Sequence, residues 1–119
     1  MGAEYADFRY EEIERIRIRT KNGALEEVKE TTSRGVGFRV LKGGAFGFSA
    51  TGDLSEKSLF FHLDQAFQMA KEFSRIRHTE VKLAPTKAVK TQWVMPIRKD
   101  PWGLSLEEKA ASLVEAEKS

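Results

Sequence analysis

The chain has 119 residues, with 20 Lys and Arg against 18 Asp and Glu, and its formal net charge is +2 at pH 7. This length predicts a single domain over residues 1–119 with a modest core. The sequence contains no cysteine, which excludes disulfides and favours a cytoplasmic protein. No apolar run approaches the roughly 20 residues of a membrane-spanning helix, and the amino terminus lacks the pattern of a signal peptide.

Residues 3–20 are predicted to form a strand. From Glu14 to Arg19 the isoleucines and arginines alternate, which places an apolar row on one face and a charged row on the other. Glu26, Glu27 and Glu30 follow on the expected neighbouring strand. Opposite charges on adjacent strands pair across a solvent-exposed face. Arg15, Arg17 and Arg19 are therefore interpreted as partners of these glutamates rather than as an anion-binding site.

The dipeptide Asn22-Gly23 predicts the turn that ends this first strand, because both residue types tolerate the positive φ of a type I′ turn. The return strand is expected over residues 25–32. A two-residue loop sets Ile18 against Glu27, whereas a three-residue loop sets it against Val28. We favour the three-residue loop, because it keeps apolar residues on one face.

The stretch from Arg34 to Asp53 predicts a second hairpin. Apolar residues alternate on both sides of Gly43-Gly44, at Val36, Phe38, Val40, Phe46 and Phe48. Two alternating runs around a glycine pair are a strong hairpin signal. A two-residue turn there pairs Leu41 with Phe46 and Arg39 with Phe48, and points Phe38 and Val40 to the other face.

Both faces of this hairpin are partly apolar, and one layer of helices covers only one of them. We expect Phe38 and Val40 to join the core, so the face with Phe46 and Phe48, bordered by Leu41 and Arg39, is the candidate protein interface. The opposite arrangement, with a helix over Phe46 and Phe48, stays open at this point. Three glycines inside the strands are predicted to permit close backbone approach: Gly35, Gly37 and Gly47.

A helix is predicted after the second hairpin, with Asp53 or Ser55 as its N-cap. Its apolar stripe contains Leu59, Leu63, Ala66, Phe67, Ala70 and Phe73, and Phe60 widens it. Such a stripe is typical of a helix that packs on a sheet. Phe61 falls near the polar side of the helix and is a candidate surface contact.

The remainder of the chain predicts a less regular segment and a second helix. Residues 76–99 lack a clear period, although Thr91 to Val94 are expected to form a short strand. Ser105 and Glu108 have the spacing of a capping box, and the helix that they begin is expected to run to Ser119. Antiparallel hairpins followed by two main helices predict an α+β fold, a two-layer sandwich with a mostly antiparallel sheet.

Four segments together are similar to the amino-terminal domain of the TldD/PmbA family, zinc metallopeptidases once called modulators of DNA gyrase. The glycine-rich hairpin resembles the family's arginine-glycine-x-glycine strand, glycine turn and aromatic-glycine-phenylalanine strand. The other three segments occur in the same order as in the family. They are Gly2-Ala3-Glu4-Tyr5-Ala6-Asp7-Phe8-Arg9, Asn22-Gly23-x-Leu25-Glu26, and Asp100-Pro101 with Leu106-Glu107-Glu108-Lys109.

The resemblance implies a metallopeptidase that acts in proteolysis, cleaves unfolded peptides and assembles as a homo- or heterodimer. It also implies a zinc domain outside this chain, with a His-Glu-x-x-x-His motif and a later cysteine. We therefore expect an excised or naturally reduced amino-terminal domain that is inactive alone. Its partners would be the catalytic domain, a second subunit or an extended peptide at a sheet edge.

The residues of this chain offer little catalytic chemistry of their own. The two histidines, His62 and His78, are sixteen positions apart and there is no cysteine, so no metal, cofactor or catalytic residue is assigned. Three serines, Ser49, Ser55 and Ser58, are judged to lack a neighbouring histidine for nucleophilic work.

Two other classes of function remain open. Residues 71–99 hold eight Lys and Arg against two Asp and Glu, a local charge of +6, with Trp93 available for stacking. Such a segment is compatible with a nucleic-acid-binding module, although the charge is diffuse and no binding motif accompanies it. A stand-alone interaction protein is the third possibility, and no membrane partner is expected.

Overall fold

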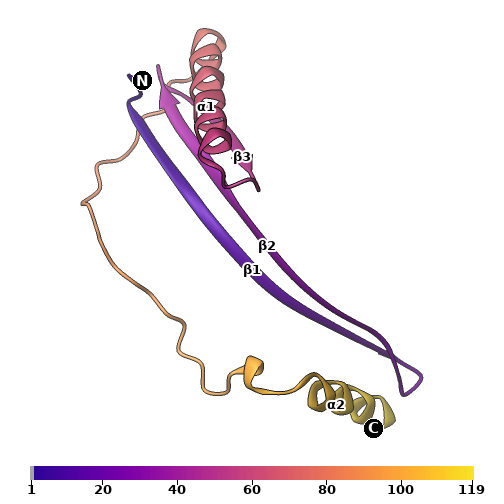
Figure 1. The fold of residues 1–119 in the computed structure, drawn as a ribbon. Helices are drawn as coiled ribbons and strands as arrows, with labels where there is room; N and C mark the ends of the chain where they lie inside the picture. Colours follow the sequence, from indigo (N-terminus) through magenta and orange to yellow (C-terminus); the bar gives the residue numbers. More distant parts are fainter. Residues whose placement is uncertain (1) are drawn as a thin grey trace. The chain divides into compact units, whose positions relative to one another are not determined.

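A computed structural model describes residues 2–119, which form an α+β fold as predicted (Figure 1). The strands are β1 (Tyr5–Lys21), β2 (Ala24–Lys42) and β3 (Ala45–Thr51), and they form one antiparallel sheet in the order β1-β2-β3. The helices are α1 (Glu56–Ile76) and α2 (Leu106–Lys118), with a 3-10 turn at Pro101–Gly103. In the described residues, no helix has the length and apolar character to cross a membrane.

The described residues divide into two compact units. The first contains the residues up to Ile13 and Ser33–Thr86, and the second contains Glu14–Thr32 and Lys87–Ser119. Strands β1 and β2 contribute residues to both units. The sequence prediction of a single domain over residues 1–119 is not tested by this division and stays a prediction.

The glycine hairpin between β2 and β3 has the predicted register. Leu41 lies opposite Phe46, and Arg39 lies opposite Phe48. Gly43 and Gly44 have φ angles of 55° and 70°, which are the left-handed values that a type I′ turn requires at both central positions. The turn residues and the apolar alternation on both sides of the turn therefore indicate the same register between β2 and β3.

The loop between β1 and β2 corrects the sequence prediction. It contains two residues, Asn22 and Gly23, with φ angles of 52° and 71°, so the preferred three-residue loop is wrong. The chemistry of the turn decides the loop here, because both residues adopt left-handed backbone angles at low cost. The return strand is also longer than expected, since β2 continues without a break from Ala24 into the glycine hairpin.

Helix α1 begins as predicted, with Ser55 as its N-cap. The Ser55 hydroxyl accepts a hydrogen bond from the Ser58 amide at 3.3 Å, and the Asp53 carboxylate accepts one from the Ser55 amide at 2.8 Å. Within the predicted stripe, Ala66 and Ala70 are buried, while Phe60 and Phe73 are exposed. The sequence assignment of Phe60 and Phe73 to the buried face is therefore wrong, and Ser74 is the residue that lies over the turn at Gly43.

The core of the first unit lies between α1 and one face of the sheet. Val36, Phe38 and Val40 of β2 pack against Ala66 and Ala70 of α1. The partly buried side chains that surround them are Ala3, Leu54, Leu59, Leu63 and Phe67. This is the arrangement expected from the sequence, in which Phe38 and Val40 belong to the core.

Gly47 of β3 allows the helix to approach this closely. A β carbon at position 47 would overlap the carbonyl oxygen of Ala66 and lie 2.5 Å from the amide nitrogen of Ala70. Both obstacles are backbone atoms, so a side chain at this position could be accommodated only by moving the helix. The glycine of the strand and the alanines of the helix thus bring the two backbones into direct contact.

In the second unit, α2 begins with the predicted capping box between Ser105 and Glu108. Near its other end, the Glu117 carboxylate accepts hydrogen bonds from the Thr20 hydroxyl and the Gly23 amide, each at 2.6 Å. These bonds hold the pKa of Glu117 below its usual value and connect α2 to the β1–β2 turn. The strand predicted at residues 91–94 is absent from the described secondary structure.

Replacing Gly47 with alanine tests the contact between α1 and β3. We expect Gly47→Ala to lower the free energy of unfolding by about 1–3 kcal/mol, because the new methyl group displaces the helix backbone. The measurement is urea unfolding followed by circular dichroism. Gly103→Ala is the matched control, since a β carbon there meets nothing within 4 Å. Equal stability of the two variants would contradict the contact.

Candidate interaction face

The candidate site is the face of the sheet opposite α1 in the first unit, called the outer face here. Arg39 and Leu41 of β2 alternate with the core residues, and their partners Phe48 and Phe46 lie beside them on β3. Phe48 is 58% exposed and Phe46 is half-buried, whereas Leu41 is only 3% exposed. The four predicted residues therefore share one face, but Leu41 itself offers almost no surface for contact.

The two aromatic rings of β3 each lie over a residue of β2. The guanidinium carbon of Arg39 is 5.2 Å from the centre of the Phe46 ring, a cation–π distance that contributes about 0.5–1 kcal/mol at an exposed site. A β carbon at Gly37 would lie 3.2 Å from the Phe48 ring. The ring thus covers the glycine and occupies the space that a side chain would need.

The three predicted close-approach glycines have different neighbours. Gly47 faces the backbone of α1, and a β carbon at Gly35 would lie 3.1 Å from the carbonyl oxygen of Thr51 on β3. Gly37 instead faces a side chain, that of Phe48. All three glycines are therefore closely approached by other residues of the first unit. The approach of another chain to them stays a prediction.

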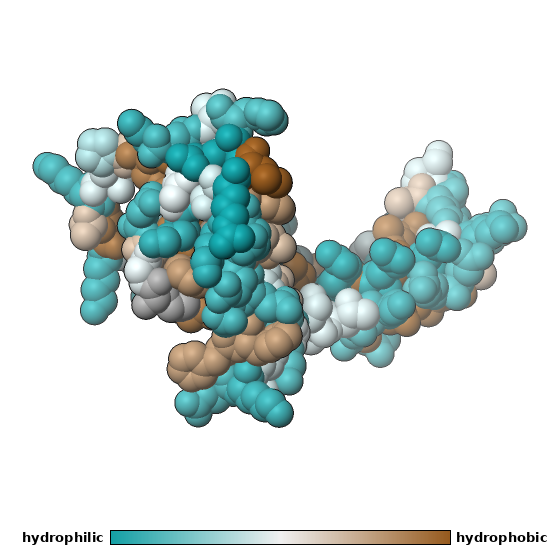
Figure 2. All heavy atoms as spheres, turned by 90° about the horizontal axis from the view of Figure 1, so that it is seen from above, coloured by the Kyte–Doolittle hydropathy of each residue, from teal (hydrophilic) through white to brown (hydrophobic). Residues whose placement is uncertain are grey.

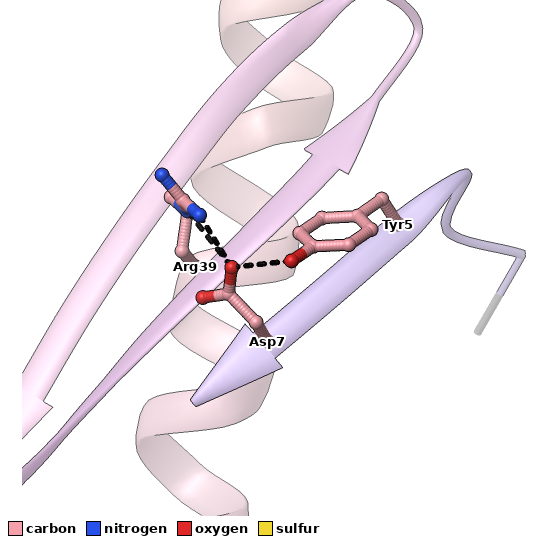
Figure 3. Close-up of polar contacts among 3 residues, drawn as sticks. All are labelled: Tyr5, Asp7 and Arg39. Carbon is pink, nitrogen blue, oxygen red and sulfur yellow. Dashed lines mark hydrogen bonds and ion pairs between the residues drawn. The ribbon is translucent and has the colours of Figure 1, made fainter. Parts of the chain in front are cut away.

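Tyr5, Asp7 and Arg39 form a polar cluster that was not predicted from the sequence (Figure 3). Two Arg39 nitrogens donate to one oxygen of the Asp7 carboxylate, Nη2 at 2.5 Å and Nε at 3.2 Å. The Tyr5 hydroxyl donates to the same oxygen at 2.7 Å. Asp7 and Arg39 are 32 positions apart in the sequence, so no local motif could have revealed this ion pair.

This cluster fixes the charge state of its members. The hydrogen bond from Arg39 holds the pKa of Asp7 below its usual value, and the same bond raises the pKa of Arg39. The hydrogen bond to Asp7 raises the pKa of Tyr5. At neutral pH, Arg39 is therefore a cation held between the Asp7 carboxylate and the Phe46 ring.

An open groove of about 880 Å³ runs along this face of the first unit. Its lining combines apolar surface from Phe8, Ile13 and Phe48 with charge from Asp7, Arg9, Glu11, Arg34 and Arg39. Hydrophobic side chains also reach the surface elsewhere among hydrophilic ones (Figure 2). The groove therefore presents both apolar and charged side chains to solvent.

A serine and a histidine meet between β3 and α1, in contrast to the sequence expectation. The Ser49 hydroxyl lies 2.7 Å from Nδ1 of His62, so the judgement that Ser49 lacks a neighbouring histidine is wrong. The two are 13 positions apart, and the turn into α1 brings them together. The pair connects strand and helix, as does the 3.0 Å hydrogen bond between the Thr51 and Ser58 hydroxyls.

Comparison with known proteins places the chain in a family. Residues 6–72, more than half of the chain, match the family described as PmbA/TldA metallopeptidase domain 1. The chain belongs to the TldD/PmbA metallopeptidase family. It is also 28% identical over 116 residues to Metalloprotease MJ0996 of Methanocaldococcus jannaschii, an alignment that covers 98% of the chain. The chain spans about a quarter of the length of this curated relative, 26%.

The TldD/PmbA metallopeptidase family implies a metal, and a zinc site needs converging His, Cys, Asp or Glu side chains. The described residues contain no group of three or more His, Cys, Asp or Glu side chains that could hold a metal ion. Nδ1 of His62 is already within hydrogen-bond distance of Ser49, and His78 is exposed in an irregular segment. Because zinc sites use three or four converging ligands, these residues do not fit the metal.

The remaining predicted surface residues are exposed. Phe61 of α1 is exposed, and its ring makes an edge-to-face contact with His62 at 5.2 Å. Trp93 in the basic segment is 74% exposed. Of the predicted charge pairs between β1 and β2, Arg19 lies 3.9 Å from Glu26 and 4.0 Å from Glu27. These exposed pairs contribute little to stability.

The ion pair of the outer face predicts a pH dependence that Asp7→Asn should reduce. Because the pKa of Asp7 is lowered in the folded state, its stabilisation is present above the unfolded carboxyl pKa of about 3.9 and is lost as the pH falls through the folded pKa. We expect Asp7→Asn to cost about 0.2–1 kcal/mol at pH 7 and progressively less as the pH falls below about 3.9. Urea unfolding at several pH values measures this. Tyr5→Phe, which keeps the ion pair, is the control, and a cost independent of pH would contradict the assignment.

Proposed function

We propose that this chain is the non-catalytic amino-terminal domain of a TldD/PmbA-type metallopeptidase and that its outer face is a docking surface. The face would pack on the catalytic domain, on a second subunit or on an extended peptide. The observation that carries the proposal is Phe48, an aromatic side chain that is more than half exposed on a regular sheet. Beside it, Arg39 is held in place by Asp7 and Phe46. Aromatic residues and arginine are enriched at the centres of protein interfaces.

The same comparison indicates which part of a full-length protein would carry the peptidase site. The relative named as a metalloprotease is almost four times as long as the matched region, since the match covers 26% of it. We place the zinc and the peptidase chemistry in the portion outside the match, because the donor groups of the described residues form no cluster that could hold a metal ion. A cytoplasmic, dimeric assembly belongs to the same proposal, supported by the lack of cysteine and the family.

Metal content and activity test the non-catalytic role. The purified chain is expected to bind no stoichiometric zinc and to cleave no unfolded peptide, as measured by elemental analysis and a fluorogenic peptide assay. Metalloprotease MJ0996, assayed in parallel, is the positive control for the conditions. One equivalent of zinc in the isolated chain, or peptidase activity that chelation abolishes, would overturn the proposal.

Substitutions on the two faces of the sheet test the docking surface. Because Phe48 is exposed and Phe46 only half-buried, the double variant Phe46→Ser with Phe48→Ser should lose no more than about 1–2 kcal/mol of stability. Phe38→Ser on the opposite face should lose about 3–5 kcal/mol, because Phe38 is buried in the core. Thermal melting monitored by circular dichroism distinguishes these outcomes.

Binding measurements on the same double variant complete the test. Self-association is followed by sedimentation equilibrium, and docking by titration with the part of Metalloprotease MJ0996 outside the match. The double variant is expected to weaken whichever association the native chain shows by at least tenfold, because it removes two central aromatic side chains. An unfolded double variant would show that the outer face is core. An unchanged association would place the interface elsewhere.

A further inference from the structure

The segment from Lys87 to Arg98 has the side-chain pattern of a strand but no strand neighbour among the described residues. Apolar side chains recur at odd positions, at Val89, Trp93, Met95 and Ile97, while the even positions hold Lys90, Gln92, Pro96 and Arg98, with Val94 as an apolar exception. Such alternation is typical of a strand with one buried face. Here all four odd apolar residues are exposed, Val89 to 78% and Trp93 to 74%.

The backbone of this segment is as open as its side chains. In the described structure, residues 82–99 make no hydrogen bond from backbone to backbone, whereas Val81 just before them donates to the Gly44 carbonyl at 2.8 Å. An irregular stretch of this length with large exposed apolar side chains is uncommon in a folded domain. A surface that covered this segment would therefore pair its free amides and also bury its exposed apolar side chains.

Pro96 determines how such a strand can pair. Proline has no amide hydrogen, so it is accommodated in a strand only where its nitrogen points away from the neighbour. Along a strand, successive amides point to opposite sides, and Pro96 lies in the even set. Pairing must therefore use the odd residues, Thr91, Trp93, Met95 and Ile97, and leave the even edge free.

The second unit does not supply the covering surface itself. Among the described residues, none in Glu14–Thr32 or Lys87–Ser119 is buried. A second copy of the segment would give only a two-stranded ribbon, which is marginally stable in water and would leave the apolar row uncovered. The occupant must bring both a strand edge and a hydrophobic core.

The relative contains a large region outside the match that could supply such an occupant. The match to the family's first domain ends at residue 72, but the similarity to Metalloprotease MJ0996 covers 98% of the chain. About three quarters of that relative lies outside the aligned region, which is 26% of its length. The segment thus belongs to sequence that the longer relative also has, outside the family's first domain.

We propose that Lys87–Arg98 is an edge strand that adds to a sheet in the part of a TldD/PmbA metallopeptidase outside this chain. Its odd residues donate the hydrogen bonds and bury Val89, Trp93, Met95 and Ile97, while Lys90 and Arg98 stay in water. The inference rests on the proposed function, since it names a second surface through which this domain joins the remainder of the enzyme. It differs from the outer face in using backbone pairing rather than side-chain contact.

Residue-resolved amide hydrogen exchange, read by mass spectrometry with electron-transfer fragmentation, tests the edge strand. In the isolated chain, the amides of residues 89–97 should exchange at unstructured rates, while those of β3 are protected. In full-length Metalloprotease MJ0996, the positions aligned with Thr91, Trp93, Met95 and Ile97 should exchange at least about 100-fold more slowly, a protection typical of paired strands. The positions aligned with Lys90, Gln92 and Val94 should stay fast, which gives an alternating pattern.

Trp93→Ser and Gln92→Ser provide a matched pair in the isolated chain. Both should leave its melting temperature unchanged, because Trp93 has no covering surface there. A lower melting temperature for Trp93→Ser alone would show that this chain covers the tryptophan itself, and would overturn the proposal.

Three further results would also overturn the edge strand. The first is uniformly fast amide exchange of the aligned segment in Metalloprotease MJ0996. The second is protection of the segment in the isolated chain that rises with protein concentration, which would indicate pairing with a second copy. The third is steeply salt-dependent binding of single-stranded DNA that Trp93→Ser abolishes. Each leaves the metal analysis and the Phe46 and Phe48 variants unaffected. Zinc or peptidase activity in the isolated chain would instead refute the proposed function, whatever the exchange pattern.

Discussion

The close approach of α1 to Gly47 is the constraint on which the first unit depends. The missing side chain at this position lets the backbones of strand and helix touch, with Ala66 and Ala70 as the small residues opposite. Once the helix lies there, Phe38 and Val40 are covered, whereas Phe48 on the opposite face stays exposed. One glycine thereby decides which face of the sheet becomes core and which stays available.

The available face is ordered rather than merely exposed. Asp7 and the Phe46 ring hold Arg39 between them, and Phe48 lies over Gly37. Side chains already fixed in position lose less conformational entropy when a partner binds. This surface is the basis of the docking role proposed above for this member of the TldD/PmbA family.

The sequence was sufficient where turn chemistry and side-chain alternation agreed. At Gly43-Gly44 both indicated the same register, and the pairing of Leu41 with Phe46 was predicted correctly. At Asn22-Gly23 the turn chemistry indicated a two-residue loop, whereas side-chain alternation indicated three residues, and the prediction followed the alternation. That choice failed because the β1–β2 hairpin has no buried residue in the second unit, so no core enforced the apolar register and the turn residues set the loop.

The candidate site was predictable only in its local part. Phe46, Phe48 and Arg39 were found because strand alternation places them on one face. The cluster of Tyr5, Asp7 and Arg39 and the pair of Ser49 and His62 were not found, since each joins residues from different elements. Charge–charge and hydroxyl–imidazole contacts of this kind leave no periodic pattern in a single sequence.

Hydroxyl-radical footprinting of the monomeric chain tests the central claim, that the helix on Gly47 leaves one aromatic face free. The rate at which each phenylalanine is oxidised reports its access to solvent. We predict rapid oxidation of Phe48 and strong protection of Phe38, because the first is more than half exposed and the second is buried. Protection of Phe48 together with rapid oxidation of Phe38 would contradict the account, since the helix would then cover the other face.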